Sequence, residues 1–209
     1  MSAAVPGVVV VTDRAQATAA GRDLVETVAA ALDAGAGAVL LREKDLDAAE
    51  RRRLAGELRA ATAACGAELW VASDVDLAVA VGADAVHLAA ADRWPAPVGG
   101  LRRGRSCHHV DELVTAAGAG ADHVTYSPVF VTASKPGYGP ALGLAGLAAG
   151  CRAVPGLAVV ALGGIVPGRA RGCREAGASA VALMGAIMAG PDPAAVVRSV
   201  VDEMTGASP

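Results

Sequence analysis

The sequence predicts an α/β fold, a single (β/α)8 TIM barrel that occupies residues 1–209 as one domain. Three observations predict it: short apolar runs alternate eight times with segments of helical periodicity, one motif recurs between them, and no glycine fingerprint follows the first run. A doubly wound open sheet is the rival fold, and it would need that fingerprint after Thr12. We therefore expect the closed barrel.

The recurring motif, Gly-Ala-x-x-Val, joins a helix to each even-numbered strand. It begins at Gly35, Gly82, Gly120 and Gly177. We expect each glycine to end its helix in the left-handed conformation and the following valine to enter the barrel. A repeat on every second unit is what an eight-fold barrel leaves in its sequence.

The strands are expected at the short apolar runs, which suit buried parallel strands. They are residues 8–12, 38–41, 68–72, 85–88, 105–107, 123–126, 158–162 and 180–184. The helices are expected where apolar residues recur at helical spacing, over residues 23–34, 47–64, 75–81, 111–117, 144–151, 169–176 and 193–204. Segments 92–104 and 127–143 carry turn residues and are expected to be loops, the second long enough to be functional.

Composition limits the classes of partner. The 209 residues carry a net charge of −3 with scattered basic residues, which argues against nucleic acid. No apolar run is long enough for a membrane span, and the first forty residues show no signal-peptide pattern. The four cysteines have neither metal nor redox spacing, so we expect a reduced, cytoplasmic protein. A homodimer is left open, because barrels of this size often pair.

Two apolar runs near the end of the chain pass through glycine toward a helix, at Gly163-Gly164 and at Met184-Gly185. Glycine lets backbone approach a ligand closely, and N–H groups at helix N-termini favour anions. In an eight-fold barrel the loops after strands seven and eight commonly form a phosphate site. We expect a phosphate here, although tight turns alone would also explain the glycines.

Catalytic groups of such barrels lie at the C-terminal ends of the strands. Those ends supply further candidates: Asp13, Arg42, Glu43, Lys44, Ser73, Asp74, Asp92, Ser106, His108, Thr132, Ser134 and Lys135. Arg42 and Lys44 alternate, so both can point inward while Glu43 points out. A surface ion-pair patch is the alternative for the two cations, and a capping role is the alternative for His108.

Other polar residues are expected to be structural. His87 lies inside a strand and is expected in the core, whereas His109 is expected in solvent and His123 at a strand edge. The run 51–53, three arginines, is expected to be a solvated helix face. Asp74 opens a helix, where the dipole favours a carboxylate.

Motifs spread over nearly the whole chain resemble the thiamine phosphate synthase and thiazole tautomerase superfamily. They are Leu-Arg-Glu-Lys-Asp at 41–45, the segment 75–88 that ends in Val-His-Leu, Gly-Arg-Ser-Cys-His at 104–108, Ser-Pro-Val-Phe-Val-Thr-Ala-Ser-Lys at 127–135 and Leu-Gly-Gly-Ile at 162–165. The resemblance implies the same barrel and a thiamine-biosynthesis enzyme that binds a thiazole phosphate. It identifies the superfamily better than it separates the two activities.

A synthase of this superfamily joins a pyrimidine diphosphate to a thiazole phosphate, with Mg²⁺, and loses pyrophosphate. The resemblance implies that Arg42 and Lys44, helped by Lys135, hold the pyrophosphate and that Ser106 lies near the pyrimidine. It implies that the thiazole phosphate lies on a larger set, namely Thr132, Ser134, Gly164, Met184 and Gly185.

Departures from the family pattern fall mainly on the pyrimidine and metal half of that site. Leu40 stands where the pattern has Gln, and Ala72-Ser73 stands where it has Asn-Asp. Asp92 matches the remaining metal carboxylate, and a lone carboxylate is a poor Mg²⁺ anchor. Asp74, next door, is an alternative ligand. At the phosphate site, Gly185 replaces a serine but keeps the backbone donor.

This pattern favours a metal-independent thiazole tautomerase, which needs no cofactor. His108 matches the histidine that moves the proton when the thiazole carboxylate phosphate is aromatised, and an imidazole pKa near ~6.5 suits that transfer. Arg42 and Lys44 would then hold the substrate carboxylate or shape the pocket. The alternatives are a synthase with an altered magnesium site at Asp92 and a non-catalytic relative that binds a phosphate ligand.

Overall fold

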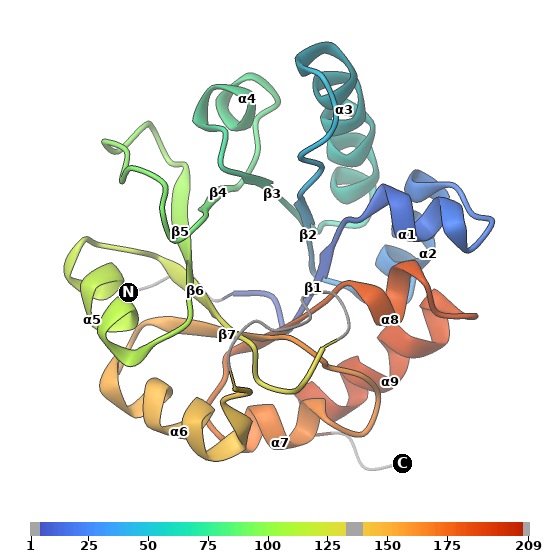
Figure 1. The fold of residues 1–209 in the computed structure, drawn as a ribbon. Helices are drawn as coiled ribbons and strands as arrows, with labels where there is room; N and C mark the ends of the chain where they lie inside the picture. Colours follow the sequence, from blue (N-terminus) through green and yellow to red (C-terminus); the bar gives the residue numbers. More distant parts are fainter. Residues whose placement is uncertain (1–4, 133–139, 207–209) are drawn as a thin grey trace.

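The computed structural model describes residues 5–132 and 140–206, and it is a closed barrel of parallel strands (Figure 1). The strands pair in chain order, and the last pairs with the first, with Val9 opposite Ala182. They are β1 (Val8–Val11), β2 (Ala38–Leu41), β3 (Glu68–Ala72), β4 (Ala85–Leu88), β5 (Arg102–Cys107), β6 (His123–Tyr126), β7 (Ala158–Leu162) and β8 (Ala180–Leu183). The predicted (β/α)8 barrel is confirmed.

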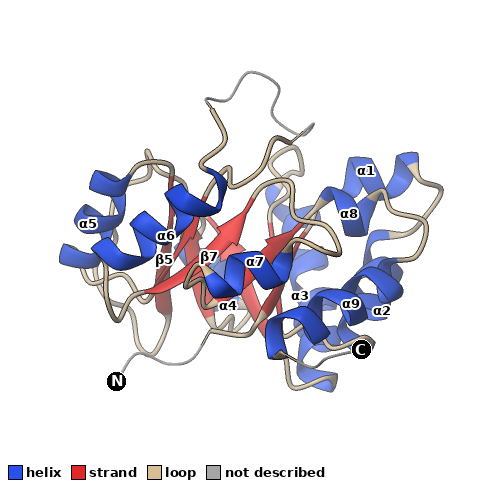
Figure 2. Ribbon diagram, turned by 90° about the horizontal axis from the view of Figure 1, so that it is seen from below, coloured by secondary structure: helices blue, strands red, loops and turns tan. Residues whose placement is uncertain are grey.

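The helices surround the barrel and cover the outer face of its strands (Figures 1 and 2). They are α1 (Arg14–Ala19), α2 (Leu24–Asp33), α3 (Ala48–Ala64), α4 (Val75–Ala80), α5 (Val110–Gly118), α6 (Gly143–Ala153), α7 (Ala170–Glu175), α8 (Gly185–Met188) and α9 (Pro193–Thr205). Outward-facing strand residues and the inner helix faces form one large apolar layer. The valines of the recurring motif were expected to enter the barrel, and this is wrong: they all lie in this outer layer, namely Val39, Val86, Val124 and Val181.

Local sequence signals explain where many helices begin and end. Aspartates precede several helices and accept a backbone N–H of the first turn: Asp13, Asp23, Asp47, Asp74 and Asp192. The four motif glycines all have positive φ, from 62° at Gly82 to 103° at Gly35. The prediction that they end helices in the left-handed conformation is therefore confirmed.

Three elements were not predicted or differ from the prediction by more than two residues at one end. The short helices α1 and α8 were not expected, because neither is long enough to show a helical period. Strand β5 begins at Arg102, earlier than predicted, although its first residues are polar. Arg102 makes an ion pair with Glu68, and the Arg103 N–H donates to Asp122 Oδ2 at 2.8 Å. These polar partners replace the apolar run that the prediction required.

The interior of the barrel has two different halves. The half lined by β7, β8, β1 and β2, here called the apolar half, is filled by small and branched side chains: Val9, Val11, Ala38, Leu40, Val160, Ala180 and Ala182. The half lined by β3 to β6, here called the polar half, contains Trp70 and two histidines, His87 and His123, stacked beside it. The tilted Trp70 and His123 rings lie 4.1 Å apart between centroids.

His87 is buried as predicted, but the prediction for His123 is wrong. His123 was expected at a strand edge, and its side chain is fully buried inside the barrel. Gly104, opposite it on β5, makes this possible, because a Cβ on Gly104 would lie 2.0 Å from His123 Nε2. A strand-edge position cannot be distinguished from an inward one until the facing residue is known.

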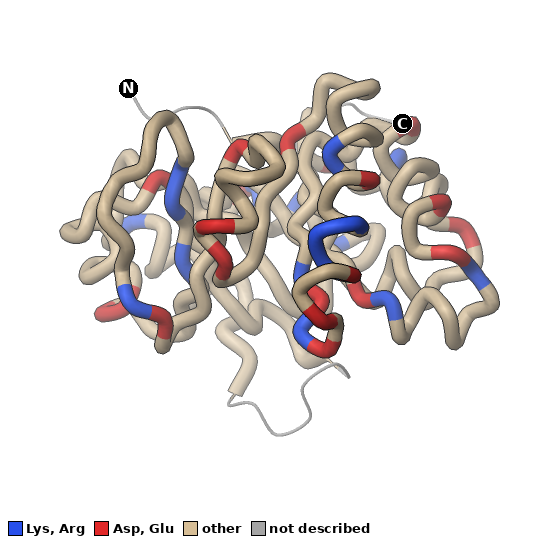
Figure 3. The backbone as a smooth tube through the Cα atoms, turned by 90° about the horizontal axis from the view of Figure 1, so that it is seen from above, with Lys and Arg blue, Asp and Glu red and all other residues tan. Residues whose placement is uncertain are grey.

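The surface carries both signs of charge (Figure 3). Lysine and arginine are interspersed with aspartate and glutamate along the described chain. Within residues 5–132 and 140–206, no helix is long and apolar enough to cross a membrane.

Candidate active site

The C-terminal ends of parallel strands in a closed barrel lie on one rim. Arg42 follows β2, His108 follows β5 and Gly164 follows β7, so the topology brings these three predicted residues to that rim. Ser134 and Lys135, also predicted for the site, lie outside the described residues.

At the ends of β1 and β2, backbone and carboxylate contacts fix the orientation of the Arg42 segment. The Arg42 N–H donates to Thr12 Oγ1 at 2.8 Å. Glu43 is buried, and its carboxylate accepts the Arg14 N–H at 3.0 and 3.2 Å. Burial raises the pKa of Glu43, while its hydrogen bonds to Thr12 and Arg14 oppose that rise. The expectation that Glu43 points out is therefore wrong, because its carboxylate is buried and anchors α1, whereas Lys44, next along the chain, is exposed.

The ends of β3 and β4 do not fit a magnesium ion held by protein carboxylates. Asp74 Oδ1 accepts the Leu77 N–H at 2.8 Å, and Oδ2 lies 3.6 Å from Arg51 Nη1. Asp92 Oδ2 accepts the Ala89 N–H at 2.7 Å within its own loop. In the described ranges, no group of three or more His, Cys, Asp or Glu residues could hold a metal ion. The alternative that Asp74 replaces the missing ligand is therefore disfavoured.

Arg51 was predicted to be solvent-exposed, and this is wrong. Its Nη2 donates to the Ala72 carbonyl at 2.7 Å, and Nη1 faces Asp74. Arg51 thus ties α3 to the end of β3, whereas Arg52 and Arg53 are on the exposed face as predicted. Ser73, between the two partners of Arg51, has a φ of 58°. A non-glycine residue in this conformation is uncommon and is found disproportionately at functional sites.

At the ends of β5 and β6, His108 is held in one tautomer. Its Nδ1 lies 2.8 Å from the Ser127 carbonyl oxygen, which can only accept a hydrogen bond. Nδ1 therefore carries the hydrogen of the neutral ring, and Nε2 is the basic nitrogen. The His108 N–H also donates to Glu112 Oε2 at 2.5 Å, so α5 fixes the backbone here. This geometry supplies a ring nitrogen able to take up a proton.

At the end of β7, two glycines accept the close packing of the loop that follows β6. Gly163 and Gly164 have φ values of 101° and 64°. A Cβ on Gly163 would lie 2.8 Å from Pro128 Cα, and one on Gly164 would lie 2.5 Å from the Val131 carbonyl oxygen. The Phe130 N–H donates to the Gly163 carbonyl at 3.0 Å. The pair is required by backbone packing, and it brings the predicted residue Thr132 to the same corner of the rim.

Sequence reasoning missed two arginines that hold these loops. Arg169 Nη1 donates to the Gly164 carbonyl at 2.7 Å, and its guanidinium lies 4.8 Å from the centre of the Phe130 ring. Arg22 Nη2 donates to the Met188 carbonyl at 2.7 Å, at the end of the helix that Met184 and Gly185 begin. Neither arginine stands in a motif, so only the folded chain identifies it.

The family comparison agrees with this arrangement. The family model described as thiamine monophosphate synthase matches residues 8–187, which include every strand of the barrel. The chain belongs to the thiamine monophosphate synthase family. The expected superfamily is thus confirmed.

Several proteins that are 30% to 41% identical to this chain bear names of this family. The chain is 41% identical to a putative thiamine-phosphate synthase of Geobacter sulfurreducens over 197 residues, 91% of each chain. It is 38% identical to a thiamine-phosphate synthase of Roseiflexus castenholzii, over 93% of this chain and 86% of that one. A solved thiamine phosphate pyrophosphorylase from Pyrococcus furiosus superposes with a TM-score of 0.84 at 30% identity, covering 96% of each chain.

Proposed function

We propose that this protein is a thiamine-phosphate synthase, which joins a pyrimidine diphosphate to a thiazole phosphate and releases pyrophosphate. Family membership and the names of its relatives support this proposal. It replaces the tautomerase favoured by the sequence, because the family model and the relatives named above are described as synthases. The four cysteines are unpaired thiols, in keeping with a thiamine-biosynthesis enzyme of the cytoplasm.

The observation that carries the proposal is that two neighbouring strands, β7 and β8, are each followed within two residues by a glycine. Gly163 and Gly164 carry no side chain of their own at the end of β7, where Pro128 and Val131 pack against them, and Met184 and Gly185 lead directly into α8. We assign the thiazole phosphate to this corner, together with Thr132 and Ser134. Backbone N–H groups suit a phosphate because they are oriented donors that need no reorganisation.

Arg42 and Lys44, with Lys135, are assigned to the diphosphate. The reaction forms a bond from the thiazole nitrogen to the pyrimidine's methylene carbon and breaks the bond from that carbon to the diphosphate oxygen, so negative charge grows on the leaving diphosphate. A guanidinium presents paired donors to phosphate oxygens, and a lysine adds a point charge. Both interactions strengthen as the charge develops, which lowers the barrier for the step.

The family implies magnesium, which would add positive charge beside the diphosphate. The carboxylate of Asp74, which follows β3, accepts a backbone N–H of α4 and faces Arg51. The carboxylate of Asp92, which follows β4, accepts a backbone N–H of its own loop. The described residues therefore do not fit a resident metal, and the assignment above uses only groups of the protein.

A thiazole tautomerase is the second candidate, and one observation favours it. The bond from His108 Nδ1 to the Ser127 carbonyl leaves Nε2 as the basic nitrogen of the neutral ring. A base held in this way could move the proton that aromatises the thiazole. The misfit of the metal residues points the same way, because proton transfer needs no metal.

One experiment separates the candidates. The protein is incubated with pyrimidine diphosphate and thiazole phosphate, with and without Mg²⁺, and in parallel with the unaromatised thiazole carboxylate phosphate. The synthase proposal predicts equal amounts of thiamine phosphate and pyrophosphate in the first reaction. Aromatisation alone, abolished by His108→Asn and unchanged by Arg52→Gln, would instead establish the tautomerase.

A further inference from the structure

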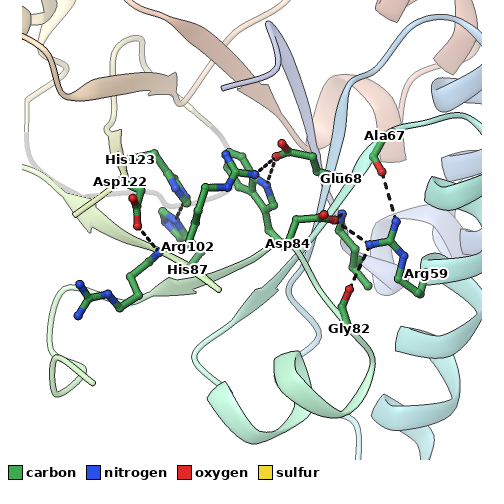
Figure 4. Close-up of polar contacts among 12 residues, drawn as sticks. Arg59, Ala67, Glu68, Gly82, Asp84, His87, Arg102, Asp122 and His123 are labelled. Atoms are coloured by element: carbon green, nitrogen blue, oxygen red, sulfur yellow. Dashed lines mark hydrogen bonds and ion pairs between the residues drawn. The ribbon is translucent and has the colours of Figure 1, made fainter. Parts of the chain in front are cut away.

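The polar half of the barrel contains a buried pair of histidines that the proposed reaction does not use. The His87 and His123 rings stack with centroids 5.2 Å apart, and the side chains of both are almost fully shielded from solvent (Figure 4). Trp70 packs against His123, and its Nε1 donates to Glu68 Oε2 at 2.7 Å. The ion pair of Glu68 with Arg102 therefore fixes Trp70, and Trp70 in turn holds the histidine stack in place.

Hydrogen bonds connect this stack to the rim. His123 Nε2 lies 3.1 Å from His87 Nδ1, and His87 Nε2 lies 3.1 Å from Ser106 Oγ and 3.2 Å from Thr125 Oγ1. Thr125 is buried, whereas Ser106 is partly exposed and stands two residues before His108. Ser106 is thus the hydroxyl at which the buried chain of bonds reaches the site.

Both rings are neutral in the folded protein. Burial lowers the pKa of His87 to about 4, and burial, followed by the neighbouring His87 and Arg102, lowers the pKa of His123 well below its usual value. Two neutral rings that face each other share one hydrogen between the facing nitrogens. The chain of bonds can therefore run in only two directions, from His123 toward Ser106 or from Ser106 toward His123.

The nitrogen at the end of this series of hydrogen bonds, His123 Nδ1, decides between the two directions. His123 Nδ1 is buried and has no hydrogen-bond partner in the part of the chain that the structure describes. If the bonds ran toward His123, this nitrogen would carry a hydrogen with no acceptor, fixed in the ring plane. If they run toward Ser106, Nδ1 is a bare acceptor, and the hydroxyl hydrogens of Ser106 and Thr125 can rotate to other partners. A buried unpaired N–H is the costlier outcome.

We propose that His123 and His87 are positioning residues that fix the Ser106 hydroxyl as a hydrogen-bond donor to the substrate. In the favoured direction His87 Nε2 donates to Ser106 Oγ, so the hydroxyl hydrogen of Ser106 is directed toward another acceptor, at the rim. The site then favours a heteroaromatic ring that presents an acceptor nitrogen, because His87 occupies one of the two acceptor positions of Ser106 Oγ while the hydroxyl hydrogen stays available. Assigning that ring to the pyrimidine diphosphate rests on the proposed function.

Nitrogen NMR of the full chain tests the direction without any substrate. Two-bond ¹H–¹⁵N correlations distinguish the two neutral tautomers of each ring, and the His87→Gln and His123→Gln variants assign the signals. We expect both rings in the Nε2–H form at pH 7.5. Either ring in the Nδ1–H form would overturn the proposal, whatever the activity of the protein.

Kinetics test the consequence at the site. His123→Leu removes the donor, and we expect the KM for pyrimidine diphosphate to rise about tenfold while the KM for thiazole phosphate stays unchanged. His123→Gln places an amide N–H near the position of Nε2 and should restore that KM to within about threefold. Equal changes in both KM values, or no rescue by glutamine, would overturn the proposal. If NMR shows both rings in the expected tautomer but the protein makes no thiamine phosphate, the synthase assignment is rejected and the proposed direction of the hydrogen bonds stands.

Discussion

The two halves of the barrel are built on different principles. In the apolar half, β7, β8, β1 and β2 enclose small aliphatic side chains, and the rim at β7 is fixed by backbone packed on Gly163 and Gly164. In the polar half, β3 to β6 enclose Trp70 and two histidines, and the rim is made of side chains bonded to their own loops. Backbone packing tolerates little substitution, whereas side chains can be exchanged on an unchanged barrel. Of the departures from the family pattern, Ala72 and Ser73 lie at the rim of the polar half, whereas Leu40 and Gly185 belong to the apolar half.

Removing a cation from the rim should have the largest effect on activity. Arg42→Gln is expected to lower kcat/KM for synthesis by about 100- to 1,000-fold, because a developing charge loses its donor. Arg52→Gln, on the exposed face of α3, is the matched control and should leave kcat/KM unchanged. An Arg42→Gln variant as active as the control would show that the Arg42 guanidinium does not stabilise the leaving diphosphate.

The backbone-built rim of the apolar half should respond with a large loss of stability. Gly164→Ala forces a Cβ into contact with Val131 at a positive φ, and we expect it to cost about 3 kcal/mol of unfolding free energy. Gly168→Ala is the control, because it also has a positive φ but open space, and should cost about 1 kcal/mol. Urea unfolding measures both values. Equal losses would show that packing on Gly164 is unimportant.

The polar half should give the protein a pH-dependent stability. Because the folded pKa of His87 is lowered from 6.5 to about 4, the unfolded chain binds a proton in this range that the folded chain does not. The contribution of His87 is thus fully present above pH 6.5 and should fall by about 3 kcal/mol as the pH drops to 4. His87→Gln should lose less stability over the same range in urea titrations. Parallel curves for the two proteins would contradict the buried neutral histidine.

The side-chain rim of the polar half should accept substitution without unfolding. The double change Ala72→Asn and Ser73→Asp restores the family pattern, and we expect Mg²⁺ to raise the activity of this variant about tenfold more than that of the unmodified protein, whose carboxylates do not fit a resident metal. The control carries Asn at both positions, so it adds the amides without the charge. Both residue types tolerate the left-handed conformation at position 73. If Mg²⁺ dependence changed equally in the two variants, the missing carboxylate would not be the cause of weak metal binding.

The sequence predicted the strands more completely than the contacts between residues far apart in the chain. The strands β2, β3, β4, β6 and β7 have the predicted bounds, because apolar runs and glycine stops are local signals. The inward position of His123 depends on Gly104 in another strand, and the contact of Arg51 with Ala72 joins a helix to a strand end. Such pairings are set by tertiary packing, so no local pattern reveals them. The roles of the rim residues in binding and catalysis remain predictions.

Binding of thiazole phosphate in the presence of EDTA tests most directly whether the glycine-built rim holds a phosphate by itself. Calorimetry compares this ligand with the corresponding thiazole alcohol, which lacks the phosphate. We predict that the phosphate ester binds about 100-fold more tightly, because oriented N–H donors recognise its charge without a metal. Equal affinity of the two ligands, or binding of the ester only when Mg²⁺ is added, would contradict a phosphate site at the ends of β7 and β8.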